Sequence, residues 1–533
     1  MQKKISLKLL PSEAADEAAI LTYIAKAEAV SSKAITGFHL LKQSIDARSR
    51  QVYINLTVNA FINEPFDERQ TERIVFQDVS NARHKVVIVG AGPAGLFAAL
   101  KLLEAGIKPI IIERGKDVRA RRRDLALLNK EGEVNAESNY CFGEGGAGTY
   151  SDGKLYTRST KRGDVNRILN LLVQFGADER ILYEAHPHIG TNQLPKIITA
   201  MREQIITAGG EVLFEKKLSG LKKEGDTVKA VITADGDVLA ADAVVLATGH
   251  SARDIFGLFY KEQLLIEAKP FALGVRIEHP QTLIDAIQYH SPDRGEWLPP
   301  ASYSLVEQVD DKGVFSFCMC PGGIIAPAAT APGELVVNGW SPSKRNNPYS
   351  NSGMVVSLSL EDALQDADFK QRVKQHKWAH DHPLLLMYFQ QMVEQHAYNA
   401  GGGKFAAPAQ RMADFCNNKV SASLPVCSYV PGVHATSLQQ VLPAFVHTRL
   451  QEGFKAFGKK MRGYYTNDAI VVATESRTSS PVRIPRDQES LQHPQLQNLY
   501  PCGEGAGYAG GIVSAAMDGE RVAAVIAALR TVV

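Results

Sequence analysis

Residues 85–115 constrain the fold of this chain more than any other stretch, because they read as strand, turn, helix and strand. Val86–Val89 is a continuous β-branched run, which is typical of a strand buried on both faces of a parallel sheet. A helix is expected from about Pro93 to Ala105, and a second apolar strand from Pro109 to Ile112. Between the first strand and the helix stand three glycines in the pattern Gly-x-Gly-x-x-Gly: Gly90, Gly92 and Gly95.

Each glycine of this turn has its own expected role in binding a dinucleotide. Gly90 permits the tight turn, Gly92 lets the backbone approach a pyrophosphate, and Gly95 lets the helix pack closely on the strand. The free N–H groups of the first helical turn then face two phosphates. Glu113 ends the second strand, where a carboxylate accepts hydrogen bonds from ribose hydroxyls. The residues expected to contact the cofactor here are Gly90, Ala91, Gly92, Pro93, Ala94, Gly95, Glu113 and Arg114.

The composition narrows the class of protein. A length of 533 residues allows two or three domains, and 45% hydrophobic with 22% charged residues is typical of a globular protein. The net charge of +2 is too balanced to favour a nucleic acid or an anionic membrane as partner. No apolar run approaches the ~20 residues that span a bilayer, no signal peptide is recognised, and the six cysteines are unpatterned. We therefore expect a cytoplasmic protein with a small-molecule substrate, and leave the oligomeric state open.

Three later segments contain glycine and are also expected to contact the cofactor. Cys141–Lys154 is too rich in glycine for a helix or strand, and is expected to form a loop beside the cofactor. Asp242–His250 is a second buried strand that ends in Ala-Thr-Gly, and Leu499–Gly519 combines a short strand, an acid and a helix start. The expected cofactor contacts in these segments are Gly145, Gly146, Ala147, Gly148, Thr248, Gly249, Gly503, Glu504, Gly510, Gly511 and Ile512.

The order of expected elements divides the chain into three units. Residues 1–80 read as a β-α-β-β module, which we favour as a packing or oligomerisation appendage over a ligand-binding unit. Residues 81–265 and 466–533 are expected to form one discontinuous dinucleotide-binding domain of the Rossmann-like α/β class. Residues 266–465 are assigned to an inserted α+β domain that serves as a substrate or cap domain.

Together these motifs resemble the flavoprotein superfamily built on the glutathione-reductase type of FAD domain. The superfamily usually has Asp at the position of Glu504. More narrowly, several segments resemble a bacterial family of FAD-dependent dehydrogenases (NAD(FAD)-utilising dehydrogenase-like): Gly145–Lys154, Gly401–Arg411, Arg477–Arg483 and Gly503–Gly511. The resemblance implies non-covalently bound FAD and an oxidoreductase activity, and it implies no particular substrate.

The chain departs from the disulfide reductases of this superfamily in two respects. Those enzymes carry Cys-x-x-Cys or Cys-x4-Cys beside the flavin and a second Gly-x-Gly-x-x-Gly for NADPH, and this sequence has neither. Gly401-Gly-Gly403 follows an expected helix and is not the missing motif. If NADH or NADPH is the electron donor, it must visit transiently, without a nicotinamide domain.

The predicted function is that of an FAD-dependent oxidoreductase, which passes hydride through flavin N5 to or from a small organic substrate. The candidates near the ring are Lys154, Glu475 and Arg477. Lys154 either stabilises negative charge on the reduced flavin or is an exposed loop lysine, and Arg477 either holds a substrate carboxylate or forms a structural ion pair. Two alternatives stay open: FAD that is structural or serves a macromolecule such as tRNA, and a reductase of isoprenoid double bonds with an apolar tunnel.

Other chemically suggestive residues are expected to be structural. Strand alternation places Cys318 and Cys320 on one face, and we favour buried, inert thiols over a redox pair. Cys141 and His250 are the conceivable points of covalent flavin attachment, while packing is the favoured role of Cys141. The basic run Arg119–Arg123 is read as a solvated helix face rather than a phosphate site. No metal site is expected, since His186-Pro-His188 has no partner Cys or acid at ligand spacing.

Overall fold

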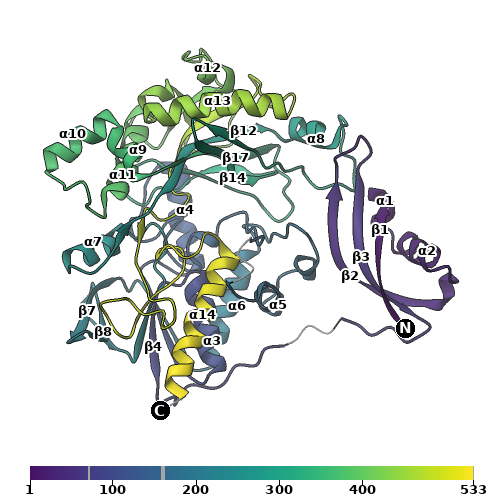
Figure 1. Cartoon of the computed structure of the whole chain (residues 1–533), viewed down its shortest axis with the longest axis horizontal. Helices are drawn as coiled ribbons and strands as arrows, with labels where there is room; N and C mark the ends of the chain where they lie inside the picture. The colour runs from purple at the N-terminus through teal and green to yellow at the C-terminus, as the bar shows by residue number, and fades with distance from the viewer. Residues whose placement is uncertain (70–72, 158–161, 532–533) are drawn as a thin grey trace.

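The computed structural model describes residues 1–69, 73–157 and 162–531, and its first unit is a small antiparallel sheet in the order β1-β3-β2 (Figure 1). The strands and the helical segment follow the predicted β-α-β-β order, but the segment is divided into two helices, α1 and α2, rather than one. Ile5, Leu7 and Leu9 alternate with exposed residues, and they pack on Ile20 and Ile24 of the covering helix. The bounds are β1 Gln2–Leu9, α1 Pro11–Ala14, α2 Glu17–Glu28, β2 Ile35–Asp46 and β3 Tyr53–Ile62.

This N-terminal unit contacts the rest of the chain through its edge strand β2. The Gln43 N–H donates to the Tyr183 carbonyl at 2.8 Å, and the Ala185 N–H donates to the Gln43 carbonyl at 2.9 Å. His290 Nε2 lies 3.0 Å from the carbonyl oxygen of Ala47. The unit is thus seated at the side of the molecule, as Figure 1 shows, and one of its sheet edges is partly covered.

A five-stranded parallel sheet in the order β22-β10-β4-β5-β6 organises the dinucleotide-binding part. Its central strand is the run that was predicted from sequence, and its last strand comes from the C-terminal end of the chain. Because all strands are parallel, their carboxyl ends and the turns that follow them meet at one edge. The bounds are β4 Lys85–Val89, β5 Lys108–Glu113, β6 Glu211–Phe214, β10 Ala243–Leu246 and β22 Leu499–Pro501.

The two faces of this sheet are covered differently. Val86 and Ile88 pack on a layer of helices, in which α3 and α14 run side by side (Figure 1). Val87 and Val89 pack on a small antiparallel sheet and one helix. The helices are α3 Pro93–Glu104, α4 Val118–Glu131, α5 Val165–Gln174, α6 Leu194–Thr207, α7 Arg253–Lys261 and α14 Ile512–Thr531, and the strands of the small sheet are β7 Leu218–Glu224, β8 Thr227–Thr233 and β9 Val238–Ala240.

A second, mostly antiparallel sheet has seven strands in the order β13-β14-β17-β12-β20-β18-β19. The strand β20 pairs with β12 and β18 in this sheet, so it lies on the other side of the boundary that was expected at residue 466. The bounds are β12 Phe271–Pro280, β13 Val306–Val309, β14 Lys312–Cys320, β17 Tyr349–Leu358, β18 Ala407–Arg411, β19 Val433–Ala435 and β20 Ile470–Glu475.

Helices cover the outer face of this seven-stranded sheet, and α13 lies across it in Figure 1. The region expected to be helical between Glu361 and Ala397 contains three of them, and Gly401 follows the last. The helices are α8 Gln281–Tyr289, α9 Leu360–Gln365, α10 Ala367–His376, α11 Leu385–Ala400, α12 Met412–Cys416 and α13 Ala444–Lys460. Two short ribbons complete the structure: β11 Glu267–Ala268 with β21 Val482–Arg483, and β15 Ile324–Pro327 with β16 Val337–Trp340.

Within the described part of the chain, no helix combines the length and the apolar composition that a membrane crossing needs.

Candidate functional site

A cavity of about 330 Å³ lies between the carboxyl-end turns of the parallel sheet and one face of the seven-stranded sheet. Most residues predicted to bind the cofactor line it, namely Gly90, Gly92, Pro93, Ala94, Glu113, Arg114, Gly146, Ala147, Gly148, Thr248, Gly249, Gly503, Glu504, Gly510, Gly511 and Ile512. Lys154 and Arg477 also line it. Four predicted site residues are not on the cavity wall: Ala91, Gly95, Gly145 and Glu475.

The geometry of the first turn explains why it is built from glycine. Gly90 has a φ of +108°, and a Cβ there would lie 2.4 Å from the Ala247 carbonyl oxygen. A Cβ on Gly95 would lie 2.0 Å from the Gly90 oxygen, so helix α3 can pack this closely only with glycine. A Cβ on Gly92 would meet nothing closer than 3.9 Å within the chain. The space in front of Gly92 is therefore open to a ligand, beside a helix start that suits phosphate.

The second glycine-rich loop is held against the first turn. The Gly145 N–H donates to the Ala91 carbonyl at 2.8 Å, which explains why these two residues lie behind the cavity wall. Arg121 is fully buried and fixes the loop from the other side. Its guanidinium donates to Asn139 O, Tyr140 O, Glu144 O, Gly146 O and Thr149 Oγ1 at 2.7–3.2 Å.

The expectation that the basic run is a solvated face is therefore wrong for one of its members. Arg119, Arg122 and Arg123 are exposed, whereas Arg121 faces inward with Leu125 and Leu128. The spacing i, i+4, i+7 of these three residues is a helical face, and it is the signal in the sequence that could have singled out Arg121.

Glu113 is buried at the end of β5 and joins three backbone segments. Its carboxylate accepts hydrogen bonds from the N–H groups of Ala91 and Gly115, both at 2.9 Å, and of Gly143 at 3.0 Å. A carboxylate has about four lone-pair sites, so one remains for a hydroxyl in the cavity that it lines. Arg114 is held beside it over the Phe142 ring, 4.1 Å from the ring centre.

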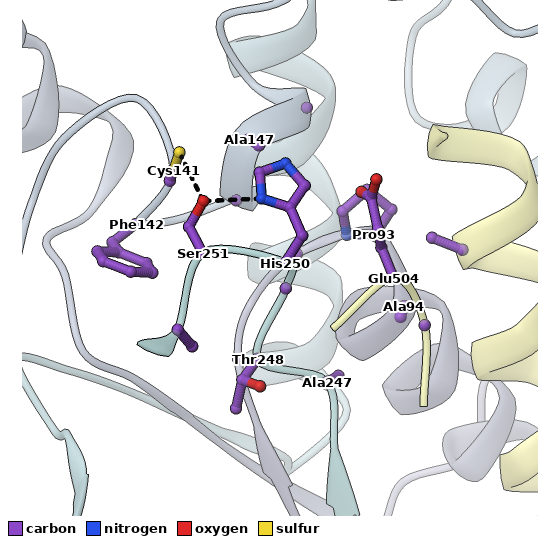
Figure 2. A pocket seen from close by; sticks show the side chains of 18 of the residues that line it. Pro93, Ala94, Cys141, Phe142, Ala147, Ala247, Thr248, His250, Ser251 and Glu504 are labelled. Atoms are coloured by element: carbon purple, nitrogen blue, oxygen red, sulfur yellow. Dashed lines mark hydrogen bonds between the residues drawn. The ribbon is translucent and has the colours of Figure 1, made fainter. Parts of the chain in front are cut away.

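Glu504 stands on the cavity wall opposite the start of α3 (Figure 2). Among the described residues, none donates a hydrogen bond to its carboxylate. Burial raises its pKa to about 7, against the opposing effect of Lys269. A buried carboxyl group that lacks a hydrogen-bond donor suits a ligand whose hydroxyl group can donate to it. Next to it, the open backbone at Gly510 and Gly511 leads into α14, and a Cβ on Gly510 would meet nothing within 4 Å.

The raised pKa of Glu504 gives a pH prediction for the apoprotein. The folded chain keeps this proton up to about pH 7, whereas the unfolded chain loses it near 4.5. The free energy of unfolding therefore falls as the pH rises between these values, by at most about 3.4 kcal/mol. We expect Glu504→Gln to flatten this fall, measured by urea unfolding at several pH values. The exposed control Glu489→Gln should follow the wild type, and parallel curves for wild type and Glu504→Gln would contradict the assignment.

Lys154 lies at the far end of the cavity and is paired. Its Nζ lies 2.9 Å from Asp152 Oδ2 and 3.6 Å from Cys320 Sγ. Asp152 is also bound by Arg345 at 2.8 Å. Burial is the largest single effect and lowers the pKa of the Lys154 ammonium, but Asp152, Cys320 and Cys318 together raise it and the net direction is upward. The cavity thus holds a fixed positive charge at this end.

Arg477 is both on the cavity wall and fully engaged in a buried ionic network. It donates to Glu394 at 2.9 and 3.0 Å and to Thr330 at 2.7 Å, and Arg253 also pairs with Glu394. Burial opposes the charge of Arg477, but Glu394 outweighs it and raises the guanidinium pKa. The geometry is that of the structural ion pair, which was one of the two roles considered for this residue.

Glu475 lies away from the cavity, and this differs from the expected position near the reacting group. Its carboxylate accepts from Arg276 Nε at 2.6 Å, and both side chains are buried. Strand β20 is buried along its whole length, so a side chain there faces a neighbouring layer rather than the cavity. Glu475 lies nine residues after the boundary predicted at residue 466, and its own segment gives no sign of its partner Arg276, which is distant in the sequence.

The cysteines that were expected to be inert differ from each other. Cys320 is buried, but the surface of Cys318 is open to the cavity, and both residues line it. Burial of the sulfur raises the pKa of the Cys318 thiol to about 11, although Lys154 acts in the opposite direction. The alternation of side chains along a strand does not predict the positions of these two cysteines, because the pairing of β14 with β17 shifts its register between Phe317 and Cys320.

A short hydrogen-bonded chain occupies the wall between the two loops (Figure 2). His250 Nδ1 lies 2.7 Å from Ser251 Oγ, and this hydroxyl donates to Cys141 Sγ at 3.4 Å. Burial lowers the pKa of His250 to about 4, and Arg477 adds to the effect, so the imidazole is neutral at pH 7. Cys141 and His250 are thus engaged with Ser251 on the cavity wall.

Comparison with protein families agrees with the observed geometry. A FAD binding domain model matches residues 83–130, and a model described as the C-terminal domain-like part of FAD-dependent proteins matches residues 270–478. A domain of unknown function matches residues 1–61. The first match covers the turn, α3 and the acid, and the second covers the seven-stranded sheet. The cavity between them fits FAD on the observations above, and the chain binds this cofactor.

Individual relatives extend this picture. An uncharacterised protein of Clostridium beijerinckii is 40% identical over 512 residues, which cover 93% of each chain. Thiamine thiazole synthase of Aeropyrum pernix is 29% identical over 185 residues, or 32% of this chain and 56% of that one. The solved structure of 2,6-dihydroxypyridine-3-hydroxylase from Arthrobacter nicotinovorans is 11% identical, covers 84% of both chains and gives a TM-score of 0.36. The chain belongs to the family of FAD-dependent proteins that includes the Clostridium beijerinckii relative.

Proposed function

We propose that this chain is an FAD-dependent oxidoreductase of a small organic substrate, with a FAD domain of the glutathione-reductase type. The observation that carries the proposal is a single cavity with two kinds of wall. One wall is made of the glycine turns and the start of α3, and the other of Phe317 and Cys318 on β14 and Asn338 on β16. A cofactor bound along the first wall leaves the second for a substrate.

When bound, the flavin supplies hydride and electron transfer, and the protein supplies binding, orientation and charge. In this proposal the first turn of α3 binds the pyrophosphate, and Glu113 and Glu504 accept hydrogen bonds from hydroxyl groups of the cofactor. Lys154 provides the positive charge at the end where Phe317 and Cys318 lie, and there it stabilises negative charge. We propose non-covalent binding, which the hydrogen bonds of Cys141 and His250 to Ser251 support.

The proposed domain division follows the sheets. Residues 81–265 and the segment after β20 form the FAD domain, and the seven-stranded sheet with its helices forms the inserted substrate or cap domain. β20 moves the second boundary from residue 466 to a position after Glu475. The N-terminal unit remains an appendage for packing or assembly in this proposal.

An anaerobic absorbance experiment tests the function. The purified protein is recorded between about 350 and 500 nm, and NADH and NADPH are then added separately. We expect a flavin spectrum, and rapid bleaching by one nucleotide would identify a reductase with a transient nicotinamide donor. A flavin that neither bleaches indicates a dehydrogenase or oxidase reduced by its own substrate. A colourless protein that FAD does not reconstitute would overturn the proposal.

A further inference from the structure

Strand β14 contains a bulge at the cavity. Its pairing with β17 joins Phe317 to Gly353 and resumes at Cys320 with Asn351, so β14 holds one residue more than its partner across this step. Cys318 lies in the bulge with a φ of +45°, which a residue with a side chain rarely adopts. Bulges of this kind re-aim a side chain next to a functional site.

A buried ion pair holds the bulge in place. Arg276 is fully buried and its Nη1 donates to the Cys318 carbonyl at 3.2 Å. The same guanidinium is fixed by Asn351 at 2.7 Å and by Glu475 at 2.6 Å. A Cβ on Gly339 of β16 would lie 2.1 Å from Arg276 Nη1, so this neighbour must also be small. Buried charges are costly, and here they support the backbone of one cavity-facing cysteine.

The two cysteines of this segment both line the cavity. Cys320 Sγ lies 3.2 Å from the carbonyl oxygen of Cys318, so the Cys320 side chain is turned back toward residue 318. Lys154 Nζ lies 3.6 Å from Cys320 Sγ and is fixed by Asp152. Burial raises the pKa of the Cys320 thiol, and the Lys154 ammonium acts in the opposite direction by favouring the deprotonated sulfur. All three side chains face the cavity that we assign to FAD and substrate.

We propose that Cys318 and Cys320 are a redox-active dithiol that forms a disulfide by passing two electrons to bound FAD. Two S–H bonds break and one S–S bond forms. The electron pair and one proton pass to FAD, and the other proton leaves to solvent, so atoms and charges balance. Lys154 stabilises the sulfur that is deprotonated first. In the reverse direction the disulfide of Cys318 and Cys320 would accept two electrons and two protons and return to two thiols, so this pair would store two electrons in addition to those that a bound flavin can hold.

This centre goes beyond the proposed function and is separate from the Cys-x-x-Cys and Cys-x4-Cys arrangements that the sequence lacks. Its two cysteines come from a strand of the seven-stranded sheet, whereas the dinucleotide loops carry the cofactor-binding residues. The bulge, the Arg276 anchor and the Lys154 charge are three features of this chain that a purely packing role of the thiols does not require.

The first test counts electrons in the FAD-loaded protein. The protein is oxidised with diamide, freed of the reagent, and titrated anaerobically with dithionite while the flavin band is followed. We expect wild type to take up about twice as many electrons per bound FAD as Cys318→Ser or Cys320→Ser. The matched control Cys427→Ser, whose thiol lies outside the cavity, should titrate as wild type does. Equal uptake by wild type and the two cavity variants would overturn the proposal.

The second test needs no variant and decides the matter if the serine variants fail to bind FAD. Tryptic cleavage at Lys312 and Lys344 releases one peptide that contains both thiols and no other cysteine. After oxidation of the FAD-loaded wild type, we expect mass spectrometry to find this peptide free of alkylating label, and fully labelled after reduction. A peptide labelled at both sulfurs despite oxidation would exclude the disulfide. FAD retention is read in the same sample, so loss of the proposed function is recognised separately.

Discussion

Replacement of Gly92 by Ala is expected to leave the fold intact and to weaken FAD binding. A Cβ at this position meets nothing within 3.9 Å of the chain, and the backbone φ of −78° suits alanine. The methyl group instead enters the space where the pyrophosphate approaches, and overpacking there costs about 1–3 kcal/mol of binding. We expect FAD affinity to fall about 10- to 100-fold, measured by quenching of flavin fluorescence. The apoprotein should unfold at the wild-type temperature.

Two further glycine variants serve as comparisons for Gly92→Ala. Gly95→Ala places its Cβ 2.0 Å from the Gly90 carbonyl oxygen, so helix α3 must shift, and we expect a loss of about 2–4 kcal/mol of stability in the apoprotein itself. Gly257→Ala on α7 meets nothing within 4 Å and lies off the cavity wall, so it should leave FAD affinity unchanged and, in a helix interior, stabilise the apoprotein by about 0.5–1 kcal/mol. Tight FAD binding by Gly92→Ala would show that the cofactor does not use this turn.

Replacement of Arg276 by Met is expected to cost about 3–5 kcal/mol of stability, because it leaves Glu475 buried without its cation. The two side chains are 0% and 2% exposed, so water cannot take the place of the lost partner. Burial already raises the pKa of Glu475 while Arg276 lowers it, and without Arg276 the carboxyl should bind a proton on folding. Urea unfolding of the variant at several pH values measures both effects, with stability recovering as the pH falls.

The double variant Arg276→Met with Glu475→Met separates the charge effect from lost packing. Removing both charges together leaves no uncompensated ion, so we expect this protein to be more stable than the single Arg276→Met variant. The exposed Arg119→Met, on a residue of the basic run, should lie within about 0.5 kcal/mol of wild type. If the double variant is the less stable one, packing rather than charge explains the cost.

Local sequence was sufficient for the cofactor turn because spacing within a few residues determines it. Gly90, Gly92 and Gly95 have the predicted places between β4 and α3, and Glu113 ends β5. The β-α-β-β order of the N-terminal unit followed from alternation and helical periodicity in the same way. These features depend on turn chemistry and on the period of apolar residues, which a single segment carries by itself.

The parts that escaped prediction depend on partners that are distant in the sequence. Arg121 is chemically identical to its neighbours in the basic run, and only packing against the glycine loop distinguishes it. Glu475 is predicted to lie near the reacting group, but it instead pairs with Arg276. Its own segment does not reveal this partner, because Arg276 belongs to another strand. Cys318 was read by alternation, which assumes an uninterrupted ladder, and the bulge in β14 removes that assumption. In each case the deciding contact is tertiary.

The position of β22 in the parallel sheet has a consequence for biosynthesis. This strand pairs with β10, yet the ribosome makes it after the whole of the seven-stranded sheet, and α14, which packs on α3, follows it. Domains generally begin to fold from the N-terminal side during synthesis. The nascent chain can therefore complete the seven-stranded sheet before the parallel sheet, and the cavity wall that follows β22 forms only once this strand and α14 have left the ribosomal tunnel.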